Sequence, residues 1–264
     1  MSQSQRKKPK KSSSQSQIVD VDEEDGAAKN TQQSHKMSAE ELERKVQEMI
    51  RYILFSDRKK LGLKRVELVK NVLKEHAKAF QAVLVEVQLR IRDVFGYELV
   101  ETVTVDGKGR GYILVNSIDK QFEDEISTLL DTDEESKHMG LLTIVLSLIF
   151  MNERPVTEVA LWHTLNKLGL YKERHSDVYG NVDKLLTQDF VKQNYLDRHK
   201  IQGADGPTWQ YDFGARSLKV VSKRSILRFV SDVYGVEAVE DWKSQYQHVL
   251  AEENVGSQPM DTSS

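Results

Sequence analysis

The stretch GLLTIVLSLIFM at residues 140–151 decides the fold of this chain. Its side chains are apolar on nearly every face of a helix, and a helix that is apolar all round lies inside a folded domain. With about 12 residues it is too short to cross a membrane, because a spanning helix needs about 20 apolar residues. Residues 140–151 are therefore predicted to form a buried core helix.

The elements that follow this helix come in a recognisable order. Residues 152–155 break the apolar pattern, which resumes at Val156 and stops before Gly169, a typical residue after a helix C-terminus. We then expect a third helix, two strands joined by the turn GADGP, and a last helix, at residues 178–187, 190–200, 208–213 and 215–234 in turn. Helices followed by a strand hairpin are the order of a winged helix.

The first half of the chain predicts the same order. Ser38 and Glu41 form a capping box that marks the start of a helix, and apolar residues define one face of it as far as Phe55. Two more helices, ending near Leu73 and Phe95, precede strands at 97–105 and 111–115, which the glycine-rich turn DGKGRG joins. The N-terminal half of the chain is therefore also predicted to form a winged helix.

The predicted fold is mainly α-helical with small β-hairpins, an α+β fold of tandem winged-helix domains with disordered termini. Residues 1–37 are rich in Ser, Gln and charged residues and almost lack apolar ones, so they are expected to be a disordered tail. The further boundaries are a first winged helix at 38–118, an acidic linker at 119–137, a second winged helix at 138–235 and a C-terminal tail at 236–264.

Two short motifs stand out in the N-terminal tail. RKKPKK is a basic cluster of the nuclear-import kind, or else a solubilising tail; its charged residues are Arg6, Lys7, Lys8, Lys10 and Lys11. IVDVDEED at 18–25 looks like a SUMO-interaction motif, in which Ile18, Val19 and Val21 add a strand to a partner's sheet. The alternative for this second motif is an inert acidic linker.

Composition excludes several classes of protein. The chain of 264 residues has no cysteine, which excludes disulfides and cysteine nucleophiles and suits a reducing compartment. No secretory signal or membrane span is found. The seven His are scattered without metal-ligand spacing, and neither a GxSxG elbow nor a P-loop is present. We therefore expect no catalytic residues, no metal, no cofactor and no small-molecule ligand.

The second winged helix carries enough local positive charge to neutralise several phosphates, although the net charge of the chain is -3. Such a patch would contact double-stranded DNA without reading its sequence, and the alternative is an ordinary solvated surface. The candidate DNA-binding residues are Lys184, Lys192, Arg198, His199, Lys200, Lys219, Lys223, Arg224 and Arg228.

Six blocks of the sequence resemble the MAGE (melanoma antigen) homology domain family, over about residues 42–234. Two lie in the first half, FGYELVE at 95–101 and GYILVNSID at 111–119. Four lie in the second half, GLLTIVLSLIFMNE at 140–153, ALWHTLNKLGLY at 160–171, YGNVDKLLTQDFVKQNYLDRHKI at 179–201 and YDFGARSLKVVSKRSILRFV at 211–230. The resemblance implies tandem winged helices that bind RING-type ubiquitin ligases.

Within this family the chain is most similar to a chromosomal branch, a non-SMC element of the Smc five/six DNA-repair complex. That resemblance implies a non-catalytic scaffold in the nucleus, associated with chromosomes. Its first winged helix would bind and stimulate a RING-type E3 ubiquitin ligase subunit. Its second would bind a kleisin subunit that bridges the SMC heterodimer, and the assembly would contact double-stranded DNA.

The resemblance also implies where the partners bind. The family's dileucine, which meets the RING partner, falls here on Val83 and Leu84, so the expected RING-binding residues are Phe80, Val83, Leu84 and Val87. For the kleisin we expect an apolar groove, because an amphipathic helix needs such a trough. Its candidate residues are Leu142, Leu146, Ile149, Trp162 and Leu165.

Two alternative functions remain open from the sequence. One is a stand-alone winged-helix regulator of transcription, which would place Arg, Asn or Gln along its third helix to read base edges. The third helix of the second half instead includes Asp183, which opposes the approach of phosphate. The other alternative is a MAGE adaptor of a different RING ligase.

Overall fold

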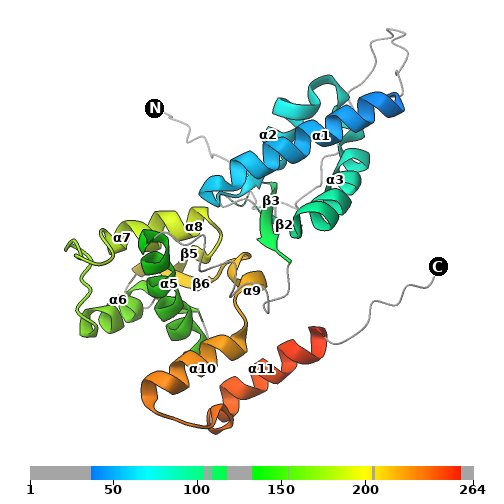
Figure 1. Cartoon of the computed structure of the whole chain (residues 1–264). Helices are drawn as coiled ribbons and strands as arrows, with labels where there is room; N and C mark the ends of the chain where they lie inside the picture. Colours follow the sequence, from blue (N-terminus) through cyan, green and yellow to red (C-terminus); the bar gives the residue numbers. More distant parts are fainter. Residues whose placement is uncertain are drawn as a thin grey trace, which may run out of the picture. The chain divides into compact units, whose positions relative to one another are not determined.

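The computed structural model describes residues 37–103, 107, 109–117, 133–153, 155–203 and 206–256 (Figure 1). The nuclear-import candidates at 6–11, the SUMO-interaction candidates at 18–21 and most of the predicted linker lie outside these residues. Within the described ranges, no helix is long and apolar enough to cross a membrane.

The first winged helix has its helices and its hairpin in the predicted order, with one short strand, β1, that was not predicted. Three antiparallel strands pair in the order β1-β3-β2, so that β2 is an outer strand. The second predicted helix is a succession of three short helical pieces. The elements are α1 (Ala39–Ser56), the 3-10 helix η1 (Asp57–Lys59), β1 (Leu63–Lys64), α2 (Arg65–Leu68), the π-helix η2 (Val69–Leu73), the 3-10 helix η3 (Lys74–Ala79), α3 (Phe80–Phe95), β2 (Tyr97–Val103) and β3 (Arg110–Asn116).

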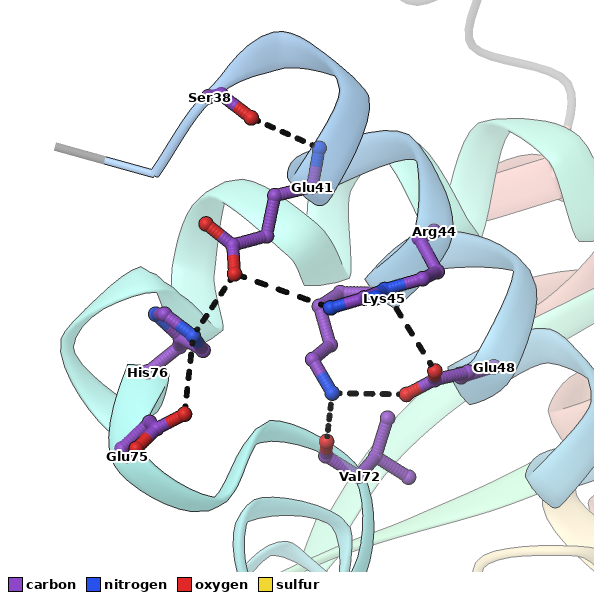
Figure 2. Close-up of polar contacts among 8 residues, drawn as sticks. All are labelled: Ser38, Glu41, Arg44, Lys45, Glu48, Val72, Glu75 and His76. Atoms are coloured by element: carbon purple, nitrogen blue, oxygen red, sulfur yellow. Dashed lines mark hydrogen bonds and ion pairs between the residues drawn. The ribbon is translucent and has the colours of Figure 1, made fainter.

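Helix α1 begins where the capping box predicts. The Ser38 Oγ accepts a hydrogen bond from the Glu41 main-chain N–H at 3.1 Å. Further along α1, the buried Lys45 donates from Nζ to the Val72 carbonyl at 2.9 Å, and the His76 Nε2 lies 3.2 Å from a Glu41 carboxylate oxygen (Figure 2). Lys45 therefore satisfies a carbonyl at the end of η2, where the helix leaves it without a partner of its own. These contacts hold α1 against η2 and η3.

The second winged helix also pairs three antiparallel strands, in the order β4-β6-β5. The apolar stretch at 140–151 forms the C-terminal part of its first helix, α5, as predicted. The elements are α5 (Asp133–Met151), β4 (Val156–Thr157), α6 (Glu158–Lys167), α7 (Val182–Lys184), the π-helix η4 (Leu185–Asp189), α8 (Phe190–Lys192), β5 (Leu196–Gly203), β6 (Gly206–Phe213), α9 (Ser217–Val220), α10 (Lys223–Tyr234), the 3-10 helix η5 (Val239–Asp241) and α11 (Lys243–Gly256).

The third helix of this domain lies further along the chain than predicted. It begins after Asn181, whose side chain accepts a hydrogen bond from the Lys184 N–H at 2.9 Å and caps the helix. It continues through η4 and α8 to residue 192, because Leu186 and Phe190, four residues apart, both enter the core. Residues 190–192 were predicted as strand, but β5 starts only at Leu196.

The end of the second winged helix also differs from the prediction. The predicted last helix is two helices, because Val221 has extended backbone angles and Ser222 caps α10 by accepting from the Ser225 N–H at 3.1 Å. Residues after 236, predicted as a tail, include η5 and α11. Val249 of α11 is 1% exposed and belongs to the core, with Trp242 packed against it. The domain therefore extends through α11.

Each winged helix has its own apolar core, and the two clusters of buried side chains share no residue. The first cluster includes Val46, Met49, Ile53, Phe80, Val83, Val87, Ile91 and Tyr112. The second includes Leu142, Leu146, Leu161, Leu165, Leu186, Phe190, Tyr211, Ile226 and Val249. The predicted α+β fold of tandem winged helices is confirmed.

Candidate partner and nucleic-acid interfaces

Helix α3 buries all four side chains that the resemblance assigns to the RING partner. Phe80, Val83, Leu84 and Val87 follow helical spacing on one face of α3 and belong to the first core cluster. The Phe80 ring packs against Tyr112 with ring centres 6.2 Å apart. In this structure these side chains hold α3 in the domain, so a partner that docks on α3 has to use other residues.

The outer face of α3 carries apolar side chains that the sequence analysis did not select. Val85 and Leu89, one helical turn apart, are 46% and 51% exposed. Together with polar residues of α3 and residues of β2 they line a cavity of about 280 Å³, whose other lining residues are Gln88, Arg92, Glu98 and Leu99. The available signal was that both apolar residues lie outside the periodic core stripe.

The five kleisin candidates are core residues as well. Leu142, Leu146 and Leu165 are buried in the second cluster and present no surface. Ile149 and Trp162 are also buried, but each lines an opening, of about 240 Å³ and about 670 Å³ respectively. Of the five candidates, only Ile149 and Trp162 therefore border a cavity that a partner could enter.

The larger of these cavities lies beside α6. Val159 on α6 is 73% exposed, and Tyr171 lies on the segment that follows this helix. Trp162 is buried at this opening, and among the described residues its indole Nε1 has no hydrogen-bond partner. The cavity is lined by Glu158, Val159, Trp162, His163, Asn166, Tyr171, Lys172, Glu173 and Arg174. The arrangement combines exposed apolar side chains with charges of both signs.

Several of the DNA candidates are paired with carboxylates of the chain itself. Lys184 Nζ lies 3.5 Å from Asp189 Oδ2, and Lys219 Nζ lies 3.8 Å from Glu98 Oε1. The His199 Nδ1 lies 3.9 Å from Asp197 Oδ2, and its Nε2 lies 3.2 Å from the side-chain oxygen of Gln210. A phosphate would have to compete with these partners, which weakens the case for Lys184, Lys219 and His199.

Arg224 is held by a carboxylate through two hydrogen bonds, more firmly than the candidates above. It donates to both carboxylate oxygens of Glu253, at 2.5 Å and 2.9 Å. This hydrogen bonding raises the pKa of Arg224 and lowers the pKa of Glu253. The neighbouring main-chain N–H of Lys223 donates to Glu252 Oε2 at 3.0 Å. The positive end of α10 is thus occupied by two carboxylates of α11.

The Arg198 side chain packs against the strands of the wing and is mostly buried. Its guanidinium lies 3.9 Å from the centre of the Trp209 ring and 5.6 Å from that of Tyr211, and it is 3.8 Å from Glu158. Burial raises the pKa of Tyr211 to about 12. Arg198 therefore stabilises the sheet by stacking.

Four DNA candidates remain, of which Lys223 is half-buried and the other three are available at the surface. The side chains of Lys192, Lys200 and Arg228 are exposed, at the end of α8, on β5 and on α10. No group of three or more His, Asp or Glu is placed to hold a metal ion in the part of the chain that the structure describes.

The sequence and the structure both match known proteins. The family model of the MAGE homology domain matches residues 49–224. The human "Non-structural maintenance of chromosomes element 3 homolog" is 34% identical over 222 residues, which cover 84% of this chain and 71% of that protein. The human "Melanoma-associated antigen D2" is 31% identical over 209 residues, 79% of this chain and 33% of that protein.

A solved structure agrees with these relatives. A chain of the "Nse1-Nse3-Nse4 complex" superposes with a TM-score of 0.70 and 33% sequence identity, covering 81% of this chain and 99% of that one. Since the family model spans well over half of the sequence and the first human relative is covered over most of its length, the chain belongs to the MAGE homology domain family.

Proposed function

We propose that this chain is a non-catalytic scaffold subunit of the Smc five/six chromosome-maintenance and DNA-repair complex in the nucleus. The observation that carries the proposal is the likeness to a chain of the Nse1-Nse3-Nse4 complex at 33% identity over 99% of that chain. The human and mouse relatives named as non-structural maintenance of chromosomes element 3 homologs, each 34% identical, support the same assignment.

The first winged helix docks and stimulates a RING-type E3 ubiquitin ligase subunit. Its docking surface is the outer face of α3 with β2, centred on Val85 and Leu89, in place of the buried residues that the resemblance assigned. An apolar pair about half exposed, beside Arg92 and Glu98, has the make-up of an apolar interface core with a polar rim.

The second winged helix binds a kleisin helix at the cavity beside α6. Val159 and Tyr171 supply exposed apolar area on the face of this cavity, as an amphipathic helix needs. Arg174 at the same cavity suits a helix with an acidic side, whereas Lys172 already donates to Glu158 at 2.9 Å. Through the kleisin the chain reaches the SMC heterodimer.

Contact with double-stranded DNA is independent of its sequence and uses the exposed Lys192, Lys200 and Arg228. The motifs of the N-terminal tail complete the proposal: residues 6–11 direct nuclear import, and Ile18, Val19 and Val21 bind SUMO.

The test is co-expression of the full chain with RING and kleisin subunits, followed by size-exclusion chromatography with mass measurement. A stable trimer of one copy each is expected. Leu89→Asp should release only the RING subunit, and Val159→Asp only the kleisin. Val66→Asp and Val233→Asp are the matched controls, since both valines are exposed at other sites, on α2 and α10.

Other results would identify the alternatives. A chain that elutes alone yet shifts duplex DNA, with a preference for one sequence above about 1,000-fold, would favour a stand-alone regulator of transcription. A chain that binds a RING subunit but no kleisin would favour a MAGE adaptor of a different ligase.

A further inference from the structure

Arg216 is an almost fully buried arginine that contacts both winged helices. Its Nε donates to the Gln193 carbonyl at 2.9 Å, its Nη1 to the Leu114 carbonyl at 2.5 Å, and its Nη2 to the Lys60 carbonyl at 3.0 Å. Gln193 follows α8 in the second winged helix, whereas Leu114 in β3 and Lys60 after η1 belong to the first. One side chain therefore bonds to the main chain of both domains.

The charge of Arg216 is matched by a buried carboxylate of the first winged helix. Asp57 Oδ1 lies 3.6 Å from Arg216 Nη2, and both side chains are less than a tenth exposed. The other oxygen of Asp57 accepts from Lys60 Nζ at 2.8 Å. Because an unpaired buried charge is strongly unfavourable, Asp57 and the three carbonyls form the environment in which a buried guanidinium is tolerated.

The main chains of the two domains also meet directly beside Arg216. The Gly62 N–H donates to the Lys192 carbonyl at 3.4 Å, and the Gln193 side chain donates to the Lys59 carbonyl at 3.5 Å. A Cβ atom on Gly62 would lie 2.7 Å from the side-chain nitrogen of Asn194. The approach is thus close enough to favour glycine at this position.

These contacts are polar, and each domain keeps a separate apolar cluster. The planar fork of arginine can donate to several acceptors at fixed angles, which neither lysine nor glutamine reproduces. A smaller or neutral residue would leave buried carbonyls without a donor. A hydrogen bond is most costly to lose when its remaining partner is buried, because water cannot replace the donor.

We infer that Arg216 couples the two winged helices into one cooperative body, which unfolds in a single step and moves as a unit. Without the Arg216 guanidinium, each winged helix stays folded on its own core, but the two reorient independently. Asp57 acts through Arg216 as a positioning residue.

The absence of cysteine makes this proposal testable by site-specific labelling, since two introduced cysteines are the only thiols. Donor and acceptor dyes are attached to Arg51→Cys on α1 and Lys167→Cys on α6, which are both exposed. Single-molecule energy transfer and thermal unfolding are then compared for the parent, Arg216→Gln, Arg216→Lys and Asp57→Asn. The matched control is Arg44→Gln, which removes an arginine whose side chain is 64% exposed.

The parent and Arg44→Gln should each give one narrow transfer distribution and one melting transition. Arg216→Gln should keep its helical circular dichroism, broaden the distribution and split the transition in two, with Arg216→Lys and Asp57→Asn between these extremes. A narrow distribution and a single transition in Arg216→Gln would overturn the inference. Loss of circular dichroism in both Arg216→Gln and Arg216→Lys would overturn it too, because Arg216 would then be needed to fold its own domain.

Discussion

Arg224 at the start of α10 and Glu253 on α11 form a two-point ion pair, with nitrogen–oxygen distances of 2.5 Å and 2.9 Å. Four residues before Glu253, Val249 is buried in the core of the second winged helix. The pair and the buried valine together hold the C-terminal helix on α10. α11 is therefore part of the domain, and a chain cut before it would lose both contacts.

Val249→Ala should lower the free energy of unfolding by about 2 kcal/mol, the order of magnitude for burying a valine side chain. Urea denaturation followed by circular dichroism measures the change. His248→Ala, at the neighbouring position, serves as the comparison, because that side chain is exposed. Equal unfolding midpoints for the two variants would show that α11 does not contribute to the core.

Glu43→Gln should remove part of the acid sensitivity of the first winged helix. Hydrogen bonds from Arg90, both at 2.6 Å, and then from Gln47 lower the pKa of Glu43 from 4.5 to about 2. Since the folded-state pKa is the lower one, the stabilisation is complete above pH 4.5 and is lost as the pH falls toward 2.

The measurement is the urea midpoint of the parent and of Glu43→Gln at several pH values between 2 and 6. The difference between the two proteins should shrink as the pH falls. Glu40→Gln on the first turn of α1 controls for the loss of one negative charge. A difference that stays constant over the whole range would contradict the proposed origin of the effect.

Lys45→Met should destabilise the first winged helix by about 2 kcal/mol, because the buried Val72 carbonyl loses its donor (Figure 2). Arg44→Met, next in the chain and mostly exposed, should change stability little. Thermal unfolding of both variants decides the point. A larger loss for Arg44→Met would mean that the surface ion pairs of α1, rather than the buried ammonium, hold this helix.

Lys200→Glu and Arg228→Glu should each weaken binding of duplex DNA and reduce the slope of log affinity against log salt by about 1. Arg198→Gln should leave that slope unchanged, because the Arg198 guanidinium stacks on Trp209. Fluorescence anisotropy at several salt concentrations gives the slopes. If Arg198→Gln lowers the slope as much as Lys200→Glu does, then Arg198 contacts phosphate. Its side chain would then leave Trp209 when DNA binds.

Apolar periodicity and a capping box were sufficient to predict α1 and α3, because the core face of a long helix repeats in the sequence. The continuous apolar stretch predicted α5, and the glycine-containing turns predicted the two hairpins. The helical patterns were less reliable elsewhere. They were insufficient at residues 182–192, where short helical pieces contain β-branched and aromatic residues that also suit strands. α11 was missed because its sequence is mostly polar. The spacing of Trp242, Tyr246 and Val249 was the signal that could have found it.

The candidate sites were harder to predict than the fold, for a physical reason. Side chains chosen by helical spacing, such as Val83 and Leu84, are by that choice core residues. Side chains available to a partner are the apolar ones outside that spacing, such as Val85 and Leu89. Arg216 leaves no periodic trace at all, because its acceptors are main-chain carbonyls distant in the sequence.

The order of strands in the two sheets bears on aggregation. Each sheet ends on one side in a strand of two residues, β1 or β4, and on the other in a longer outer strand, β2 or β5. β2 carries Glu98 and Glu101, and β5 carries Asp197 and Lys200. Short edges and charged edges both disfavour pairing with strands of another molecule. A chain with apolar side chains exposed elsewhere, such as Val85 and Leu89, is thereby protected from fibrous self-association.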